Sequence, residues 1–445
     1  MTKKILAAKK YHLTVDMVND DALYVIEKLN KNGFEAFIVG GGIRDLLLGK
    51  TPKDFDIVTN AAPEIVNKIF KRHSMIIGRR FKIVHVIFNN INPDKIYRNR
   101  PAIDRHVIEV STYRSNKVHK KNLSVHGKII SDNNYGTQKE DSIRRDFTIN
   151  ALYYDPLKQE IIDYHNGIKD IQNKVLRIIG NPMERYIEDP VRMIRAIRLS
   201  AKLNFTIDKK TAMYFDKVKL LLVNEHKGRM YEEMLKILLS GSSTKCVEIF
   251  KQLELPEDIF PLFDRLFLGS HPSELAQIIL TKTDNRLHDG NDISVIFLLA
   301  GLFWDIVTKI WNKTVSYGGS PRQSLMDAID EIQHFAYGIG VTRNMFSAMR
   351  EIWLLQIDFE TPNIRKMEQV LNNNRFRQAW HLFSARHELK EVDSKIYSWW
   401  DKFIGSEPEQ QITLIGELKQ LTSIKKDTAN KTIKRKKNIK NKVNQ

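Results

Sequence analysis

Two spacings of apolar side chains alternate along the first 155 residues. Apolar positions recur every three or four residues at 20–30 and 63–72, which predicts amphipathic helices. Short apolar and β-branched runs predict strands at residues 34–39, 55–58, 82–88 and 107–113. Polar stretches at 89–106, which has two prolines, and at 114–139 are expected to form loops. This alternation predicts a mixed sheet with helices packed against it.

From Pro182 to about Leu421 the pattern is helical almost throughout, and no fixed-period repeat is present. The predicted fold class is therefore α+β, with a mixed-sheet head, an all-α body and a disordered basic tail. The expected boundaries are a head at 1–155, a helical neck at 156–260, a helical body at 261–421 and a tail at 422–445.

The charge of the chain is strongly positive. Lys and Arg number 71 against 53 Asp and Glu, a net charge of +18, and such a balance favours polyanionic partners such as nucleic acid. The basic residues are concentrated in the tail, for example Lys434, Arg435, Lys436 and Lys437. This tail is predicted either to neutralise RNA phosphates or to serve as a solubilising, disordered end.

The chain contains one cysteine, Cys246, and 42% of its residues are hydrophobic. This composition excludes disordered and fibrous proteins, and the single cysteine favours a reducing compartment. The N-terminal residues have no apolar segment typical of a secretory signal. The longest apolar stretch, residues 295–304, is too short to cross a bilayer. We therefore expect a cytoplasmic protein without a membrane span.

A run of three glycines at residues 40–42 precedes Arg44 and Asp45. It is not a dinucleotide-binding motif, because Asp45 stands where the third glycine would be. Nor does Gly49-Lys50-Thr51 complete a P-loop, because Arg44 stands at the position of the first glycine. The glycines can nevertheless let backbone amides approach a phosphate closely.

Two acidic residues follow this turn, Asp54 and Asp56, with Phe55 between them. On a strand this spacing places both carboxylates on one face. Two such carboxylates repel each other unless a cation lies between them, and oxygen ligands favour Mg²⁺. A glycine turn for phosphates beside a Mg²⁺-binding acid pair is what nucleotidyl transfer requires.

Three ordered blocks carry a resemblance to a known family. Residues 39–45 with Asp54-Phe55-Asp56 resemble the head motif of polymerase-β-like nucleotidyltransferases, in the branch of tRNA CCA-adding enzymes and bacterial poly(A) polymerases. Residues 144–151, RRDFTINA, are similar to the R-R-D-F-T-x-N-A motif of this branch, and residues 188–192, EDPVR, to its E-D-x-x-R motif.

The resemblance implies roles for these residues. Asp54 and Asp56 are expected to hold Mg²⁺ and, with Asp146, to be catalytic. The expected nucleotide-binding residues are Gly40, Gly41, Arg44, Asp45, Arg144, Arg145, Asn150, Asp189 and Arg192. Asp146 could accept a hydrogen bond from a ribose hydroxyl, support the metal site or cap the following element. Glu109 is either a third carboxylate of the site or part of a half-buried salt bridge.

Asp189 and Arg192 also have a chemical reason to select a base. A carboxylate and a guanidinium together match the donor and acceptor on the Watson–Crick edge of adenine. Cytosine presents the same order of groups, so this pair alone does not separate ATP from CTP. Asp189-Pro190 is equally an ordinary helix start.

Residues 76–86 resemble the segment that marks bacterial poly(A) polymerases, and they place Arg79 and Arg80 at the mouth of a strand as expected RNA-binding residues. The resemblance implies template-independent addition of AMP from ATP to RNA 3′ ends, with release of pyrophosphate. This activity belongs to mRNA processing and would mark RNA for decay, with RNA-decay proteins as further partners. The alternatives are a CCA-adding enzyme and a non-catalytic RNA-binding protein on the same scaffold. The sequence indicates no oligomeric state.

Overall fold

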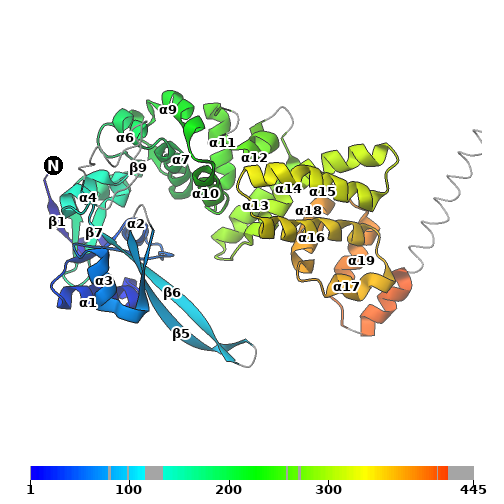
Figure 1. Ribbon diagram of the computed structural model, residues 1–445, viewed down its shortest axis with the longest axis horizontal. Helices are drawn as coiled ribbons and strands as arrows, with labels where there is room; N and C mark the ends of the chain where they lie inside the picture. The colour runs from blue at the N-terminus through cyan, green and yellow to red at the C-terminus, as the bar shows by residue number, and fades with distance from the viewer. Residues whose placement is uncertain are drawn as a thin grey trace, which may run out of the picture. The chain divides into compact units, whose positions relative to one another are not determined.

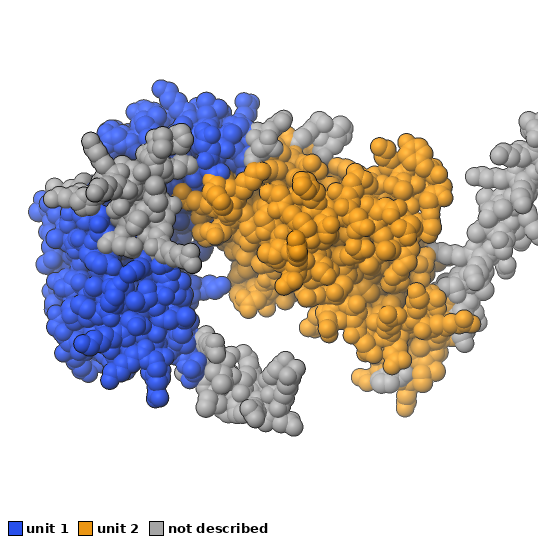
Figure 2. Space-filling model, viewed as in Figure 1, with its two compact units in different colours: residues 1–225, 252–259 blue, residues 226–251, 260–445 orange. Residues whose placement is uncertain are grey.

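The computed structural model describes residues 2–78, 82–97, 100–115, 134–256, 259–268, 272–407 and 409–418. The chain divides into two compact units, coloured separately in Figure 2. Unit 1 comprises residues 1–225 and 252–259, and unit 2 comprises residues 226–251 and 260–445.

An eight-stranded sheet forms the centre of unit 1 (Figure 1). Its strands, in spatial order, are β1 (Lys4–Ala7), β8 (Glu160–Asp163), β7 (Leu152–Asp155), β2 (Ala36–Val39), β3 (Asp56–Thr59), β6 (Arg100–Thr112), β5 (Ile83–Tyr97) and β4 (Ser74–Ile77). Neighbouring strands are antiparallel except β3 and β6, which are parallel. The predicted mixed sheet is confirmed, and it extends to Asp163.

Buried side chains explain why the central strands form. Every residue of β2 and β7 is buried, as are Ile57, Val58 and Thr59 of β3. Helices α1 (Asp20–Lys31) and α3 (Pro63–Phe70) pack against this sheet, and α2 (Gly41–Leu47) contacts β2 and β7. The helices predicted at 20–30 and 63–72 are thus confirmed within two residues at each end.

The loop expected at residues 89–106 is wrong. Strands β5 and β6 continue through most of this stretch as one long hairpin, which projects beyond the rest of the sheet in Figure 1. Its register shifts between Asn92 and Ile96, which accommodates Pro93 without a backbone donor. A hairpin that leaves the core needs no apolar alternation, which is why its polar sequence resembled a loop.

Most of the second expected loop, residues 114–139, lies outside the described residues. Its end begins α4 (Gln138–Arg144) through a capping box between Thr137 and Glu140. The remaining helices of unit 1 are α5 (Gly167–Gln172), α6 (Pro182–Glu188), α7 (Val191–Leu203), α8 (Lys209–Ala212) and α9 (Phe215–Leu221). A short parallel ladder joins β9 (Val175–Leu176) and β10 (Thr206–Ile207).

Unit 2 is helical in its described part, as predicted for the body. Its helices are α10 (Lys227–Leu238), α11 (Ser243–Leu253, which ends in unit 1), α12 (Pro261–Phe263), α13 (Glu274–His288), α14 (Val295–Ser316), α15 (Pro321–Gly338), α16 (Arg343–Glu360), α17 (Met367–Leu371), α18 (Phe376–Glu388) and α19 (Ser394–Ile404). The predicted tail lies outside the described residues.

Helix α14 is longer than the apolar stretch that marked it in the sequence. By length and composition alone it could cross a membrane. More than half of its most apolar window is buried inside the protein, where α14 packs against α13, α15, α16 and α18. These contacts are those of a core helix.

Candidate active site

The glycine turn and the acid pair meet at one end of the two central strands of the sheet, β2 and β3. Val39, the last residue of β2, pairs with Asp56, the first residue of β3. Gly40 follows with φ 70° and ψ −128°, a conformation that L side chains rarely adopt. A Cβ at Gly40 would lie 3.7 Å from Oδ2 of Asp56 and 3.8 Å from Nη1 of Arg145. The turn therefore brings bare backbone against Asp56.

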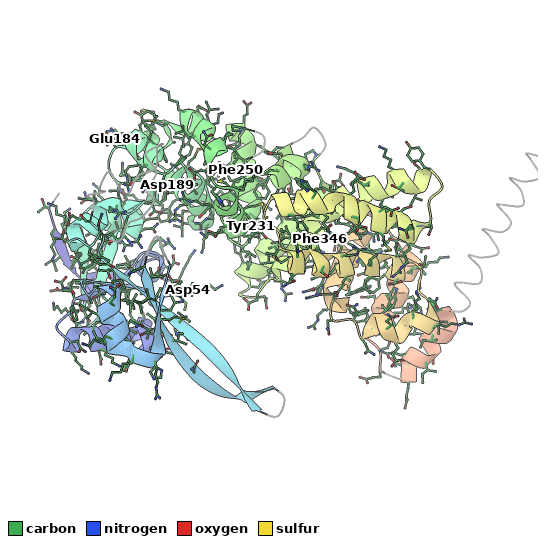
Figure 3. The ribbon with its side chains drawn as sticks, viewed as in Figure 1. Asp54, Glu184, Asp189, Tyr231, Phe250 and Phe346 are labelled. Atoms are coloured by element: carbon green, nitrogen blue, oxygen red, sulfur yellow. The ribbon has the colours of Figure 1, made fainter. Side chains whose placement is uncertain are left out.

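The acid pair, Asp54 and Asp56, shows an alternation of exposed and buried residues. Both residues are exposed, whereas Phe55 between them is buried. Strand β3 begins at Asp56, so Asp54 lies two residues before the strand (Figure 3). This exposure pattern agrees with the period-two arrangement expected from the sequence, and it lies next to the glycine turn.

Glu109 adds a third carboxylate. The parallel register of β3 and β6 pairs Asp56 with Glu109. The Glu109 side chain is half exposed, and its Oε1 lies 3.2 Å from Nε2 of His85. Desolvation, together with the negative charges of Glu109 and Asp54, raises the pKa of Asp56 to about 6, although Arg145 acts in the opposite direction. Both alternatives for Glu109 thus have support, since it adjoins the acid pair and also contacts a histidine.

These three carboxylates fit a divalent cation in their chemistry. They supply only oxygen ligands, and the repulsion that raises the pKa of Asp56 would be relieved by a bound cation. Within the described ranges, no group of three or more His, Cys, Asp or Glu residues is arranged so that it could hold a metal ion.

Arg144 and Arg145 point to different partners. Arg145 contacts Asp141 at 3.1 Å and lies over the ring of Tyr153, 5.2 Å from its centroid. Arg144 donates from Nη1 to the carbonyl oxygen of Ser115 at 2.8 Å. Burial, and then the nearby charge of Arg114, lowers the pKa of Arg144 to about 10. The two guanidinium groups therefore contact different parts of unit 1.

A buried chain of hydrogen bonds joins four predicted residues. Arg44 donates from Nη1 to Oδ1 of Asn150 at 2.8 Å and from Nε to Oδ1 of Asp45 at 2.8 Å. Asn150 in turn donates from Nδ2 to Oδ1 of Asp146 at 3.0 Å. Arg44, Asn150 and Asp146 are all buried. The residues that follow the glycine turn are thus held by the second sequence block.

Asp146 has a further partner that the sequence analysis missed, Arg195 of α7. Arg195 donates to Oδ2 of Asp146 from Nε at 3.0 Å and from Nη2 at 2.5 Å. Burial alone would raise the pKa of Asp146, but Arg195, Asn150 and the backbone amide of Phe147 outweigh it and lower the pKa to about 2. The only signal in the sequence was the position of Arg195, one helical turn after Arg192.

We expect Asp146→Asn to reduce the free energy of unfolding by about 2 kcal/mol at pH 7. A carboxyl group whose folded pKa is lowered stabilises the fold above its unfolded pKa, ordinarily 3.8, and loses this effect as the pH falls towards 2. Urea unfolding of both proteins at pH 7 and pH 3 tests this, and the difference should shrink to roughly half at pH 3. A difference that stays constant would assign the loss to something other than the ionised carboxylate.

Asp189 lies at the joint between α6 and α7 (Figure 3), and Arg192 is the second residue of α7. Asp189 accepts a hydrogen bond from the amide of Val191 at 3.2 Å, as expected of a helix start. Arg192 donates from Nη1 to Oε2 of Glu188 at 2.8 Å and to the carbonyl oxygen of Arg185 at 2.7 Å.

Arg185, a second residue that the sequence analysis missed, ties α6 to the block at 144–146. Its Nη2 donates to the carbonyl oxygens of Arg144 and Arg145 at 2.7 and 2.8 Å. Its Nη1 contacts Glu188 at 2.5 Å. The joint that carries Asp189 and Arg192 is therefore fastened to the head.

The expected RNA-binding residues lie outside the described residues. They are Arg79, Arg80, Lys434, Arg435, Lys436 and Lys437.

Comparison with known protein families gives three matches that together cover most of the chain. Residues 36–177 match the family described as Poly A polymerase head domain. Residues 204–273 match a probable RNA and SrmB-binding site of polymerase A, and residues 317–440 match the polymerase A arginine-rich C-terminus.

Individual relatives agree with these matches. Poly(A) polymerase I of Haemophilus influenzae is 35% identical over 430 residues, which cover 94% of this chain and 92% of the relative. A CCA-adding enzyme of Streptococcus mutans is 38% identical, but over 49% of each chain. Among solved structures, the Bacillus stearothermophilus CCA-adding enzyme in complex with CTP matches with a TM-score of 0.54 and 22% identity, over 85% of this chain and 80% of that one. This likeness shows the shared fold.

Proposed function

This chain belongs to the poly(A) polymerase family, and from that premise we propose how its residues add AMP from ATP to RNA 3′ ends without a template. The enzyme is a polynucleotide adenylyltransferase that releases pyrophosphate. The single observation that carries this mechanism is the closeness of the glycine turn to Asp56, since a Cβ at Gly40 would lie 3.7 Å from Oδ2 of Asp56.

Asp54 and Asp56 are the residues that would hold Mg²⁺, with Glu109 beside them. When bound, Mg²⁺ lowers the pKa of the attacking 3′-hydroxyl and neutralises charge on the triphosphate. Because the pKa of Asp56 is about 6, this carboxylate is ionised for the most part above that pH and is available as a ligand.

The glycine turn shapes the triphosphate site. Gly40 and Gly41 offer backbone without side chains, so that a phosphate can come close to Asp56. Arg44 orients Asp45 and is itself held by Asn150. Arg145 supplies positive charge near Asp56 and Gly40, where the negative charge of the triphosphate would lie. Arg144 interacts electrostatically with Glu188, Arg185 and Arg192 at the joint between α6 and α7.

The joint between α6 and α7 selects the base. Asp189 offers a carboxylate, and Arg192 uses Nη1 for Glu188 and Arg185, which leaves its other donors for an acceptor on adenine. Asp146 helps to order the nucleotide through the hydrogen bonds that it accepts from Asn150 and Arg195.

Each part of the chain has its own role in the reaction. The head at 1–155 catalyses, and the neck at 156–260 selects the nucleotide. The body at 261–421 and the tail at 422–445 bind RNA, and Arg79 and Arg80 of the head are further RNA-binding residues. The protein acts in the cytoplasm, in mRNA processing, where its product is a substrate for RNA-decay proteins.

One assay tests this function against CCA addition, the second candidate, which the half-length match to CCA-adding enzymes favours. An unrelated oligoribonucleotide and a tRNA lacking its CCA end are each incubated with Mg²⁺ and one of the four NTPs. We expect long extension of both RNAs with ATP alone, and no incorporation by Asp56→Ala, which should remain folded. Use of CTP followed by arrest after a few nucleotides would show CCA addition. RNA binding without incorporation would show a non-catalytic protein.

A further inference from the structure

Two arginines bracket the base-selecting joint and fasten it to the head at different points. Arg185 precedes Asp189 and binds the backbone of residues 144 and 145. Arg195 follows Arg192 by three residues and binds the side chain of Asp146. Residues three apart on a helix lie on the same side, so Arg192 and Arg195 share one side of α7. The orientation of Arg192 is thus coupled to the Arg195–Asp146 contact.

The carboxylate of Asp146 is fully engaged in this structure. Its Oδ1 accepts hydrogen bonds from the amide of Phe147 at 2.7 Å and from Asn150 at 3.0 Å. Its Oδ2 accepts both hydrogen bonds of Arg195. A carboxylate offers about four acceptor positions, and four N–H groups occupy them. A nucleotide hydroxyl would have to displace one of these donors to bind Asp146.

The same carboxylate connects α7 to the triphosphate side of the site. From Asp146 the hydrogen bonds run through Asn150 to Arg44 and then to Asp45, in the helix that begins at the glycine turn. The hydrogen bonds that Asn150 makes to Arg44 and Asp146 are buried, so water screens them little, whereas those from Arg44 to Asp45 and from Arg195 to Asp146 are partly buried. A displacement of α7 would therefore change the geometry of both the base-selecting joint and the glycine turn.

We propose that Arg195 is a positioning residue for base selection, and that its ion pair with Asp146 sets the distance between the base-selecting joint and the glycine turn. The inference rests on the proposed function, since it assumes that Asp189 and Arg192 select the base. Arg195 does not itself touch the nucleotide. Its loss allows α7 to shift, and a shift of about 1 Å is enough to disturb selection in a preorganised site.

The test uses Arg195→Met, which keeps the aliphatic stem but removes the ion pair, and Arg195→Lys, which restores one donor. Arg177→Met is the matched control. Arg177 also binds a buried carboxylate of unit 1, that of Asp170, at 3.2 Å, and it contacts Asp208 at 2.7 Å. The measured quantities are kcat/KM for ATP, CTP and 2′-deoxy-ATP on one RNA primer, with the melting temperature of each variant.

We expect Arg195→Met to reduce the ratio of kcat/KM for ATP to that for CTP by about 10-fold or more. Adenine and cytosine present the same order of donor and acceptor on their Watson–Crick edges, so the site distinguishes them mainly by the position of that edge. Arg195→Lys should fall between this variant and the wild type, since it cannot reproduce two donors on one oxygen. The ratio for ATP to 2′-deoxy-ATP should stay within about 3-fold. Arg177→Met should lower the melting temperature while its ATP to CTP ratio remains that of the wild type.

Equal losses for ATP and CTP in Arg195→Met would overturn the inference, because they would indicate a phosphate contact. A change confined to the 2′-deoxy-ATP ratio would overturn it in favour of a ribose contact through Asp146. If Arg195→Met does not fold, an unchanged ATP to CTP ratio in Arg195→Lys would also overturn the inference. A wild-type protein that does not extend RNA would instead contradict the proposed function itself.

Discussion

Asp56→Asn is expected to lower AMP incorporation by roughly 10³-fold, since the loss of a metal-binding carboxylate removes several kcal/mol of charge stabilisation. The amide preserves the shape of the side chain and the pairing of Asp56 with Val39 and Glu109. Primer extension with ATP and Mg²⁺ at pH 8 measures the loss. Incorporation within 10-fold of the wild type would contradict the metal assignment.

The same substitution should make the metal-free protein more stable. The folded pKa of Asp56 is about 6, above the ordinary 3.8, so ionising it destabilises the fold progressively between pH 4 and 6 and fully above pH 6. At pH 8 we expect Asp56→Asn to gain about 1 kcal/mol, a value reduced for solvent screening because the residue is exposed. Near pH 3.5 the gain should disappear.

A matched control separates this effect from a general loss of negative charge. Asp401 is an exposed aspartate of α19 in unit 2, and Asp401→Asn should change neither incorporation nor the pH dependence of melting. Added Mg²⁺ should raise the melting temperature of the wild type but not that of Asp56→Asn. Equal responses of the two proteins to Mg²⁺ would place the cation elsewhere.

Gly40→Ala is expected to cost about 1–3 kcal/mol of stability, because an L side chain is strained at φ 70° and ψ −128°. Incorporation should fall by about 100-fold, since the new methyl group would stand 3.7 Å from the Asp56 carboxylate, where a phosphate must approach. Chemical unfolding and primer extension measure the two effects.

Gly49→Ala provides the control for Gly40→Ala. Gly49 has the same φ of 70°, but a Cβ there would have no neighbour within 4 Å. We expect it to lose stability while its incorporation stays within about 3-fold of the wild type. If both variants lose activity equally, backbone strain and not access to Asp56 would explain the loss.

The sequence could predict the residues of the site whose geometry is local. The exposure of Asp54 and Asp56 on either side of buried Phe55 follows the alternation expected of an extended segment, and this needs no knowledge of the fold. The hairpin at β5 and β6 was mistaken for a loop because pairing with a partner strand, and not apolar alternation, holds it together.

By itself, the sequence determined that this protein has a mixed-sheet head, a helical body and a glycine turn followed by an acid pair, because these features depend on side-chain spacing along a short stretch of chain. Only the tertiary structure decided that Glu109 adjoins Asp56, that Arg144 donates to the carbonyl oxygen of Ser115, and that Arg195 holds Asp146. Strand register and helix packing set these contacts, and they join residues up to 53 positions apart, as Asp56 and Glu109 are. No local spacing specifies such pairs, since they form only when burial of the whole core aligns the strands and helices.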